Sequence, residues 1–158
     1  MIVLLPEFLV RRVDPVCRFE YLFDKYQSAV KKGYAHLAHH YWRTIFFKYN
    51  CQISPTAKLG SCLVFPHPMG IVIGDGVVIK DGCTIYQNVT LGQKNHLYPT
   101  LESGCTVYPN AVVMGDIVLR SGTVVGAGAV VTRGTDSPND VIAGVPAKSI
   151  KKKSTDVL

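Results

Sequence analysis

The sequence predicts a mainly β protein, a parallel β-helix that follows a short N-terminal helical segment. The main observation is a hydrophobic residue that recurs every six positions, with two interruptions. These repeat starts are Ile53, Leu59, Phe65, Ile73, Ile79, Ile85, Leu91, Leu101, Val107, Val113, Leu119, Val125, Val131 and Val141. Neither an amphipathic helix nor an alternating strand has a period of six, whereas a fixed short period is typical of stacked repeats.

A second periodic position, three residues after the start, predicts a corner in each unit. It holds Gly76, Gly82, Asn88, Gly104, Asn110, Asp116, Gly122, Gly128, Gly134 and Gly144. Gly tolerates positive φ, and Asn and Asp adopt it more often than other residues do. Each unit is therefore expected to be a short strand followed by a left-handed corner. Three units close one triangular coil, and the fourteen starts make between four and five coils.

The third observation is the helical pattern of residues 15–49, which holds no proline after Pro15 and only one glycine, Gly33. Two helices broken around Gly33 fit it best. The second, from Tyr34 to Tyr49, is rich in aromatic and basic residues. Packing on the β-helix or on a neighbouring subunit is the favoured interpretation, and contact of residues 34–49 with a membrane surface is the alternative. His36 and His40 lack the carboxylates of a zinc helix, so no metal is expected.

The length of 158 residues predicts a single domain. The sequence pattern divides the chain into a helical segment at 1–50, the β-helix at 51–150 and a basic tail at 151–158. The formal charge of +6 favours anionic partners, but no nucleic-acid recognition motif is present, so we expect none. Residues 1–10 are apolar and too short to span a bilayer. Five cysteines without a signal peptide indicate reduced thiols in the cytoplasm. Cys83 and Cys105 are expected to pack in corners.

The repeat resembles the hexapeptide repeat of left-handed β-helix acyltransferases. The segments at 53–60 (ISPTAKLG), 67–74 (HPMGIVIG), 88–92 (NVTLG) and 143–148 (AGVPAK) are similar to the serine acetyltransferase-like group, and the resemblance covers roughly residues 51–150. It is the resemblance, not the spacing, that implies the left hand, against the usual right-handed crossover. It also implies acetyl-CoA as cosubstrate and a homotrimer whose coenzyme groove lies between two subunits.

The resemblance assigns catalysis to His67, which stands in the first interruption between Pro66 and Pro68. In the family this histidine is the general base that deprotonates the acceptor hydroxyl as it attacks the acetyl thioester, a task suited to a neutral imidazole. The aspartate that orients it is replaced here by Gln52, whose amide oxygen can accept the imidazole N–H without adding charge. Gln87, Asn88 and His96 are further candidates for contacts with the acceptor.

The same resemblance predicts the donor site. Gly92, Gly126, Ala127 and Gly128 are small enough to let pantetheine run along the wall of the β-helix. Lys148, with the lysines at 151–153, offers cations for the coenzyme phosphates.

The acceptor is where the sequence departs from the serine enzymes. Their aspartate before the histidine is Pro66 here, and their Asp-Arg-His-Pro after the second interruption is replaced by His96-Leu97-Tyr98-Pro99. A free amino acid needs such charged partners, whereas a sugar does not. The predicted function is therefore O-acetylation of a sugar or polysaccharide precursor, in the cytoplasm or at the periphery of the inner membrane.

Three other functions compete with this prediction. The first is serine O-acetylation, and the second is a β-helix scaffold without catalysis, which the loss of the orienting aspartate keeps open. A zinc carbonic anhydrase is disfavoured, because it needs three histidine ligands and the repeat holds only His67 and His96.

Overall fold

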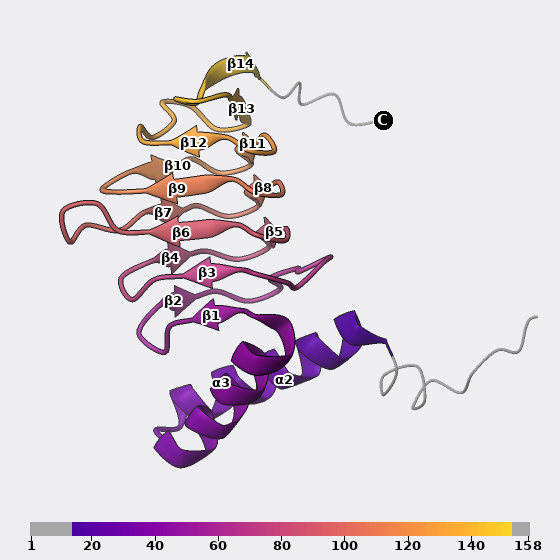
Figure 1. The fold of residues 1–158 in the computed structure, drawn as a ribbon. Helices are drawn as coiled ribbons and strands as arrows, with labels where there is room; N and C mark the ends of the chain where they lie inside the picture. Colours follow the sequence, from indigo (N-terminus) through magenta and orange to yellow (C-terminus); the bar gives the residue numbers. More distant parts are fainter. Residues whose placement is uncertain (1–13, 153–158) are drawn as a thin grey trace, which may run out of the picture.

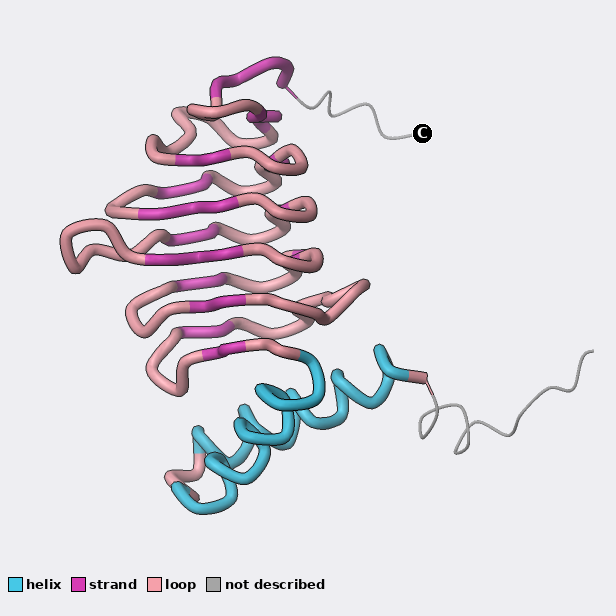
Figure 2. The backbone as a smooth tube through the Cα atoms, in the orientation of Figure 1, coloured by secondary structure: helices cyan, strands magenta, loops and turns pink. Residues whose placement is uncertain are grey.

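The structure, a computed structural model, describes residues 14–152 of the 158-residue chain. Two helices lie at one end of a three-sided prism of short strands (Figure 1). Figure 2 shows that each strand is a brief segment between corners and that the coils stack along one axis. The predictions made for residues 1–10 and for the side chains of Lys151–Lys153 lie outside what the structure describes.

The helical segment forms the two predicted helices, α2 (Pro15–Lys31) and α3 (Ala35–Tyr49). The Asp14 carboxylate caps α2 by accepting the backbone N–H of Val16 at 2.7 Å and of Cys17 at 3.0 Å, which satisfies amides that the first turn leaves free. Gly33, with φ of +71°, turns the chain between the helices.

The helices are joined to the prism by buried aromatic residues. The Tyr26 hydroxyl donates a hydrogen bond to the carbonyl of Ile53 at 2.9 Å, and burial raises the pKa of Tyr26 to about 12. Phe65, from the first coil, packs edge-to-face on Phe19 and Phe23 of α2, with ring centroids 5.3 and 5.0 Å apart. The first coil is thereby fixed against α2.

Within residues 14–152, fourteen strands make the three faces. They are β1 (Gln52–Ile53), β2 (Lys58–Leu59), β3 (Val72–Ile73), β4 (Val78–Ile79), β5 (Thr84–Ile85), β6 (Thr90–Gly92), β7 (Thr100–Leu101), β8 (Thr106–Val107), β9 (Val112–Met114), β10 (Val118–Leu119), β11 (Val124–Val125), β12 (Val130–Val131), β13 (Asp140–Ala143) and β14 (Lys148–Lys152). Sheet A has the order β1-β3-β6-β9-β12, sheet B has β10-β7-β4-β2 and sheet C has β14-β13-β11-β8-β5. All pairs are parallel except β13 with β14, which is antiparallel. The chain passes from A to B to C and turns left-handedly as it rises (Figure 1).

The repeat starts form the core, as predicted. The starts from Ile73 to Val131 are buried and stack on one another in each sheet, as in the pairs Ile73–Leu91 and Leu91–Val113. The prediction was wrong for the last unit. Val125 pairs with Ile142, not with Val141, and Ile142 is the buried residue, so the unit is displaced by one position.

The predicted corners divide into two kinds. Gly82, Asn88, Gly104, Asn110, Gly122, Gly128 and Gly144 have positive φ, at the corners that follow sheets B and C. The prediction was wrong for Gly76, Asp116 and Gly134, which follow sheet A. At Gly76 a Cβ atom would collide with the ring of Tyr98, so close packing and not backbone conformation accounts for this glycine.

The two interruptions of the repeat become two loops on opposite sides of the prism (Figures 1 and 2). Residues 66–71 leave the corner between sheets C and A. Residues 93–99 leave the corner between sheets A and B, after β6. No helix in the described range 14–152 is both long and apolar enough to cross a membrane.

Candidate active site

The corner between sheets C and A gathers most of the predicted site residues. His67, Gln87, Asn88, Gly126, Ala127 and Gly128 all follow strands of sheet C, or the bridge that extends it, and precede strands of sheet A. Backbone hydrogen bonds join one coil to the next here: the N–H of Tyr86 donates to Val107 at 3.0 Å, and that of Tyr108 donates to Val125 at 3.0 Å. The residues therefore lie along one side of the prism.

The His67 loop is held at both ends while the imidazole stays exposed. Phe65 and Pro68 are buried, and the Met69 N–H donates to the His67 carbonyl at 2.8 Å. Gly70 has φ of +65° and donates its N–H to the carbonyl of Tyr49 at 3.1 Å. A Cβ atom at Gly70 would collide with the Asn88 amide oxygen, so only glycine fits. The loop presents His67 outward on a fixed backbone.

A row of aromatic rings leads away from His67. The His67 ring lies 6.2 Å from that of Tyr86, centroid to centroid, and Tyr86 stacks on Tyr108 at 5.0 Å with 19° between the ring planes. Both tyrosines occupy the position directly after a repeat start. In the next coils this position holds Gly126 and Ala143, so the wall changes from rings to small residues.

Amide side chains border the same corner. The Asn88 Nδ2 donates to the Asn110 Oδ1 at 3.1 Å, and both residues have the positive φ that the corner requires. The Gln87 Oε1 is buried and accepts no hydrogen bond within the described part of the chain. Such an oxygen is suited to accept a hydrogen bond from a bound ligand, because leaving it unpaired is costly.

Gln52 lies at the start of β1, with its side chain exposed and its backbone paired with Val72. Among residues 14–152 no hydrogen bond joins its amide to the His67 imidazole. The orienting role of Gln52 stays a prediction.

The predicted donor residues of sheet C come together at the far end of the prism. The Gly126 N–H donates to Ile142 at 2.8 Å, a Cβ atom at Gly126 would approach that of Ala143 to 2.9 Å, and Ala143 pairs with Lys148 across β13 and β14. A cleft of about 440 Å³ is lined by Lys148 and by Arg133, a cation that the sequence analysis missed, and also by the carboxylates of Asp136 and Asp140.

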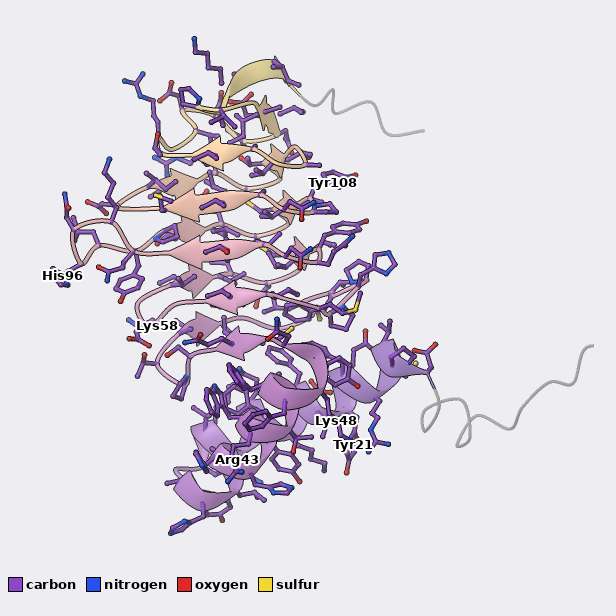
Figure 3. All side chains as sticks on the ribbon, in the orientation of Figure 1. Tyr21, Arg43, Lys48, Lys58, His96 and Tyr108 are labelled. Carbon is purple, nitrogen blue, oxygen red and sulfur yellow. The ribbon has the colours of Figure 1, made fainter. Side chains whose placement is uncertain are left out.

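Gly92 and His96 do not join this group within one chain. Gly92 ends β6 in sheet A, and His96 stands in the loop that follows. A two-residue turn carries the tip of this loop: Asn95 and His96 both have positive φ, and Lys94 and Leu97 exchange backbone hydrogen bonds of 3.0 and 3.1 Å. In Figure 3, His96 projects from the side of the prism opposite to Tyr108.

Cys83 and Cys105 do not lie at this corner. Cys83 and Cys105 are fully buried at the corner between sheets B and C, which confirms the packing prediction. A larger cleft, of about 530 Å³, lies elsewhere, between α2 and residues 60–63.

Comparison with known proteins agrees with this geometry. No protein-family model matches the chain. A serine acetyltransferase of Buchnera aphidicola subsp. Acyrthosiphon pisum (strain APS) is 34% identical over 137 residues, which cover 75% of this chain and 49% of the relative. The crystal structure of serine acetyltransferase from Vibrio cholerae O1 biovar El Tor N16961 superposes with a TM-score of 0.79 at 25% identity, over 93% of this chain and 63% of that one.

The chain is serine acetyltransferase-like in sequence and in fold. A solved serine acetyltransferase in complex with CoA also matches, with a TM-score of 0.75 at 26% identity, over 89% of this chain and 65% of that one. The serine acetyltransferase-like chain spans about half the length of the curated relative that it matches. The similarity therefore supports the fold and the repeat domain directly.

Three residues of the candidate site were missed in the sequence. Tyr86 and Tyr108 could have been found by aligning successive coils, because each follows a repeat start by one residue. Arg133 gives no such signal, since it lines the same cleft as Lys148 only because β14 folds back on β13.

Proposed function

We propose that this serine acetyltransferase-like chain is an acetyl-CoA-dependent O-acetyltransferase with His67 as general base. One observation carries the proposal: an exposed histidine on a fixed loop shares one side of the prism with the small residues Gly126 and Ala143 and with the cation Lys148. The CoA complex of a structural relative supports the same donor.

The chemistry is direct acetyl transfer. A neutral His67 imidazole accepts the proton of the acceptor hydroxyl, and the oxygen attacks the thioester carbonyl of acetyl-CoA. The C–S bond then breaks and the proton passes from the imidazolium to the leaving thiolate, which gives an O-acetyl ester and CoA. Gly126 and Ala143 leave room for the pantetheine arm, while Arg133 and Lys148 attract the phosphates.

We also propose that the working unit is a homotrimer. Gly92 and His96 were predicted to bind donor and acceptor, yet His96 lies on the side of the prism opposite to Tyr108 (Figure 3), and Gly92 ends β6 just before the His96 loop. Neighbouring copies around a threefold axis bring the two sides together, so that each site takes His67 from one chain and His96 from the next.

For the acceptor, the named relatives favour L-serine, which was the alternative in the sequence analysis. The predicted sugar acceptor has no support from the comparisons. In a trimer, Lys94 of the neighbouring loop would be the cation available to the serine carboxylate, and His96 would be a hydrogen-bond partner.

A sugar hydroxyl is kept as second candidate because of one observation. The side of the prism beside His67 carries the stacked rings of Tyr86 and Tyr108, with the Asn88 amide at the same corner. No aspartate, glutamate, lysine or arginine occurs in the segments that form this corner, which are 66–71, 86–89, 108–111 and 126–129. Tyrosine rings bordered by amides suit a polyhydroxylated ring better than a zwitterion.

The test is an acceptor panel with the purified chain and acetyl-CoA, read as thiol release with the product identified by mass spectrometry. Turnover with L-serine and none with sugars supports serine, and the reverse supports the second candidate. Saturable acetyl-CoA binding without turnover on any acceptor would contradict acetyl transfer and leave a non-catalytic scaffold.

A further inference from the structure

The outward face of α3 is aromatic and basic, and the rest of the described chain leaves it uncovered. One face of the helix packs inward through Ala38, Ile45 and Tyr49. The exposed side, here called the α3 outer face, consists of His36, Leu37, His40, Arg43, Phe47 and Lys48, with Leu37 at its edge toward α2. Phe47 has 73% of its surface exposed and Leu37 has 44%.

These residues form a stripe along the helix. His36, His40, Arg43 and Phe47 follow one another at intervals of three or four, so they lie on one line. The Arg43 guanidinium lies over the Phe47 ring at 5.9 Å. Beside the stripe, Trp42 stacks between His39 at 6.0 Å and Phe46 at 5.2 Å. The helices stand at the end of the prism, with Arg43 and Lys48 pointing away from it (Figure 3).

The sequence that contains this helix carries charge of one sign. Residues 25–74 contain six lysines and arginines, namely Lys25, Lys31, Lys32, Arg43, Lys48 and Lys58, and no aspartate or glutamate. In the described range, the nearest carboxylates along the sequence are Asp24 and Asp75. The cations of the α3 outer face therefore have no acidic residue on their own helix.

We propose that the α3 outer face adsorbs to an anionic lipid surface, with Phe47 and Leu37 entering the interface and Arg43 and Lys48 meeting the headgroups. Exposed aromatic residues combined with lysine and arginine are typical of helices that lie in the membrane interface. Each cation near an anionic leaflet adds to the attraction. Contact is shallow, because the inward face of α3 stays packed on α2 and β1.

A second copy of the chain is the other occupant to consider. A twofold contact through the α3 outer face would set Arg43 and Lys48 against their own copies, with no carboxylate on the helix to pair with them. Charge therefore favours lipid over self-association. The proposal does not depend on acetyl transfer, since none of these residues has a proposed role in that reaction.

The test is co-sedimentation of the full chain with vesicles of phosphatidylcholine alone and of phosphatidylcholine mixed with phosphatidylglycerol. The expected result is binding to the mixed vesicles only, weakened by salt. Arg43→Glu and Phe47→Ser should each weaken it, Arg43→Glu by about tenfold. Lys58→Glu is the matched control, because it reverses one charge on β2 of the prism and should have less effect.

Each other outcome overturns the proposal. Absence of binding to anionic vesicles removes it. An equal loss in Lys58→Glu and Arg43→Glu shows that net charge, not this face, attracts the vesicles. Loss in Arg43→Glu with full binding in Phe47→Ser indicates a purely electrostatic site for an anionic polymer. A lower mass of Phe47→Ser in light scattering, compared with the wild type, shows that the face joins copies of the chain.

Discussion

The imidazole of His67 lies at the end of an aromatic row, 6.2 Å from the ring of Tyr86. The row continues through Tyr108 and gives way to Gly126 and Ala143 toward Lys148. His67, the proposed base, and Lys148, the cation proposed to bind the phosphates, thus lie toward the two ends of one side of the prism. An elongated donor such as acetyl-CoA fits a wall of this form, with its thioester toward His67.

The first prediction concerns the base. His67→Ala should lower the rate of acetyl transfer by about two to four orders of magnitude, the range typical for loss of a general base. Thiol release measures the rate and circular dichroism checks the fold. Met69→Ala is the control, because Met69 is 58% exposed in the same loop and has no proposed role. Near-full activity in His67→Ala would rule out the proposed mechanism.

The second prediction concerns the donor. Lys148→Ala and Arg133→Ala should each weaken acetyl-CoA binding, because each removes a cation from the cleft at the end of the prism. Calorimetry at low salt measures the affinity. Lys58→Ala removes an exposed lysine of β2 and should leave the affinity unchanged. If all three variants bind alike, the phosphates lie elsewhere.

The fold was predictable because the six-residue period reflects the core itself. Every repeat start must fill the same inward position of a coil, so Ile79, Leu101 and Leu119 repeat in sequence because they stack in space. The inward position of the last unit was predicted wrongly because Val141 and Ile142 are both branched aliphatic residues. Only the pairing with Val125 decides which of the two side chains turns inward.

The candidate site was predictable only for residues that the repeat or a motif marks in the sequence. His67 was indicated by an interruption, and Gly126 and Lys148 by motif, and all three lie along one side of the prism. The position of His96 could not be derived, because which corner a loop leaves depends on the phase of the coil. Likewise Gly76 was explained wrongly, since the ring that it accommodates, Tyr98, comes from the next coil.

The third prediction concerns the junction between helix and prism. Phe65→Ala should destabilise the chain by about 3–5 kcal/mol, because it leaves a cavity beside Phe19 and Phe23. Activity should fall as well, since Phe65 anchors the His67 loop. Urea unfolding measures the loss, and Val118→Ala, at a partly exposed site of β10, should cost far less. Equal losses in the two variants would contradict the anchoring role.

The fourth prediction concerns the stability of the protein at low pH. The backbone N–H of Ser121, helped by Lys80 and Arg120 at 3.6 Å, lowers the pKa of Glu102 below its usual range. A lowered folded-state pKa gives stability that is present above the unfolded pKa and is lost as pH falls through the folded one. The melting temperature of the wild type should therefore exceed that of Glu102→Gln at neutral pH. The difference between the two melting temperatures should shrink as the pH falls. A difference in melting temperature that does not change with pH would contradict this account.

The last prediction asks whether Gln52 supports His67. Gln52→Asp places a carboxylate on β1, on the strand beside the one that follows the His67 loop. A carboxylate close to the imidazole favours the imidazolium form, so a higher pH is needed to deprotonate it to the neutral base. The acidic limb of the pH–rate profile should then move upward in pH. Ser103→Asp is the control, because it adds the same charge at an exposed position on the corner between sheets B and C. If both variants leave the profile unmoved while His67→Ala is inactive, His67 acts without Gln52.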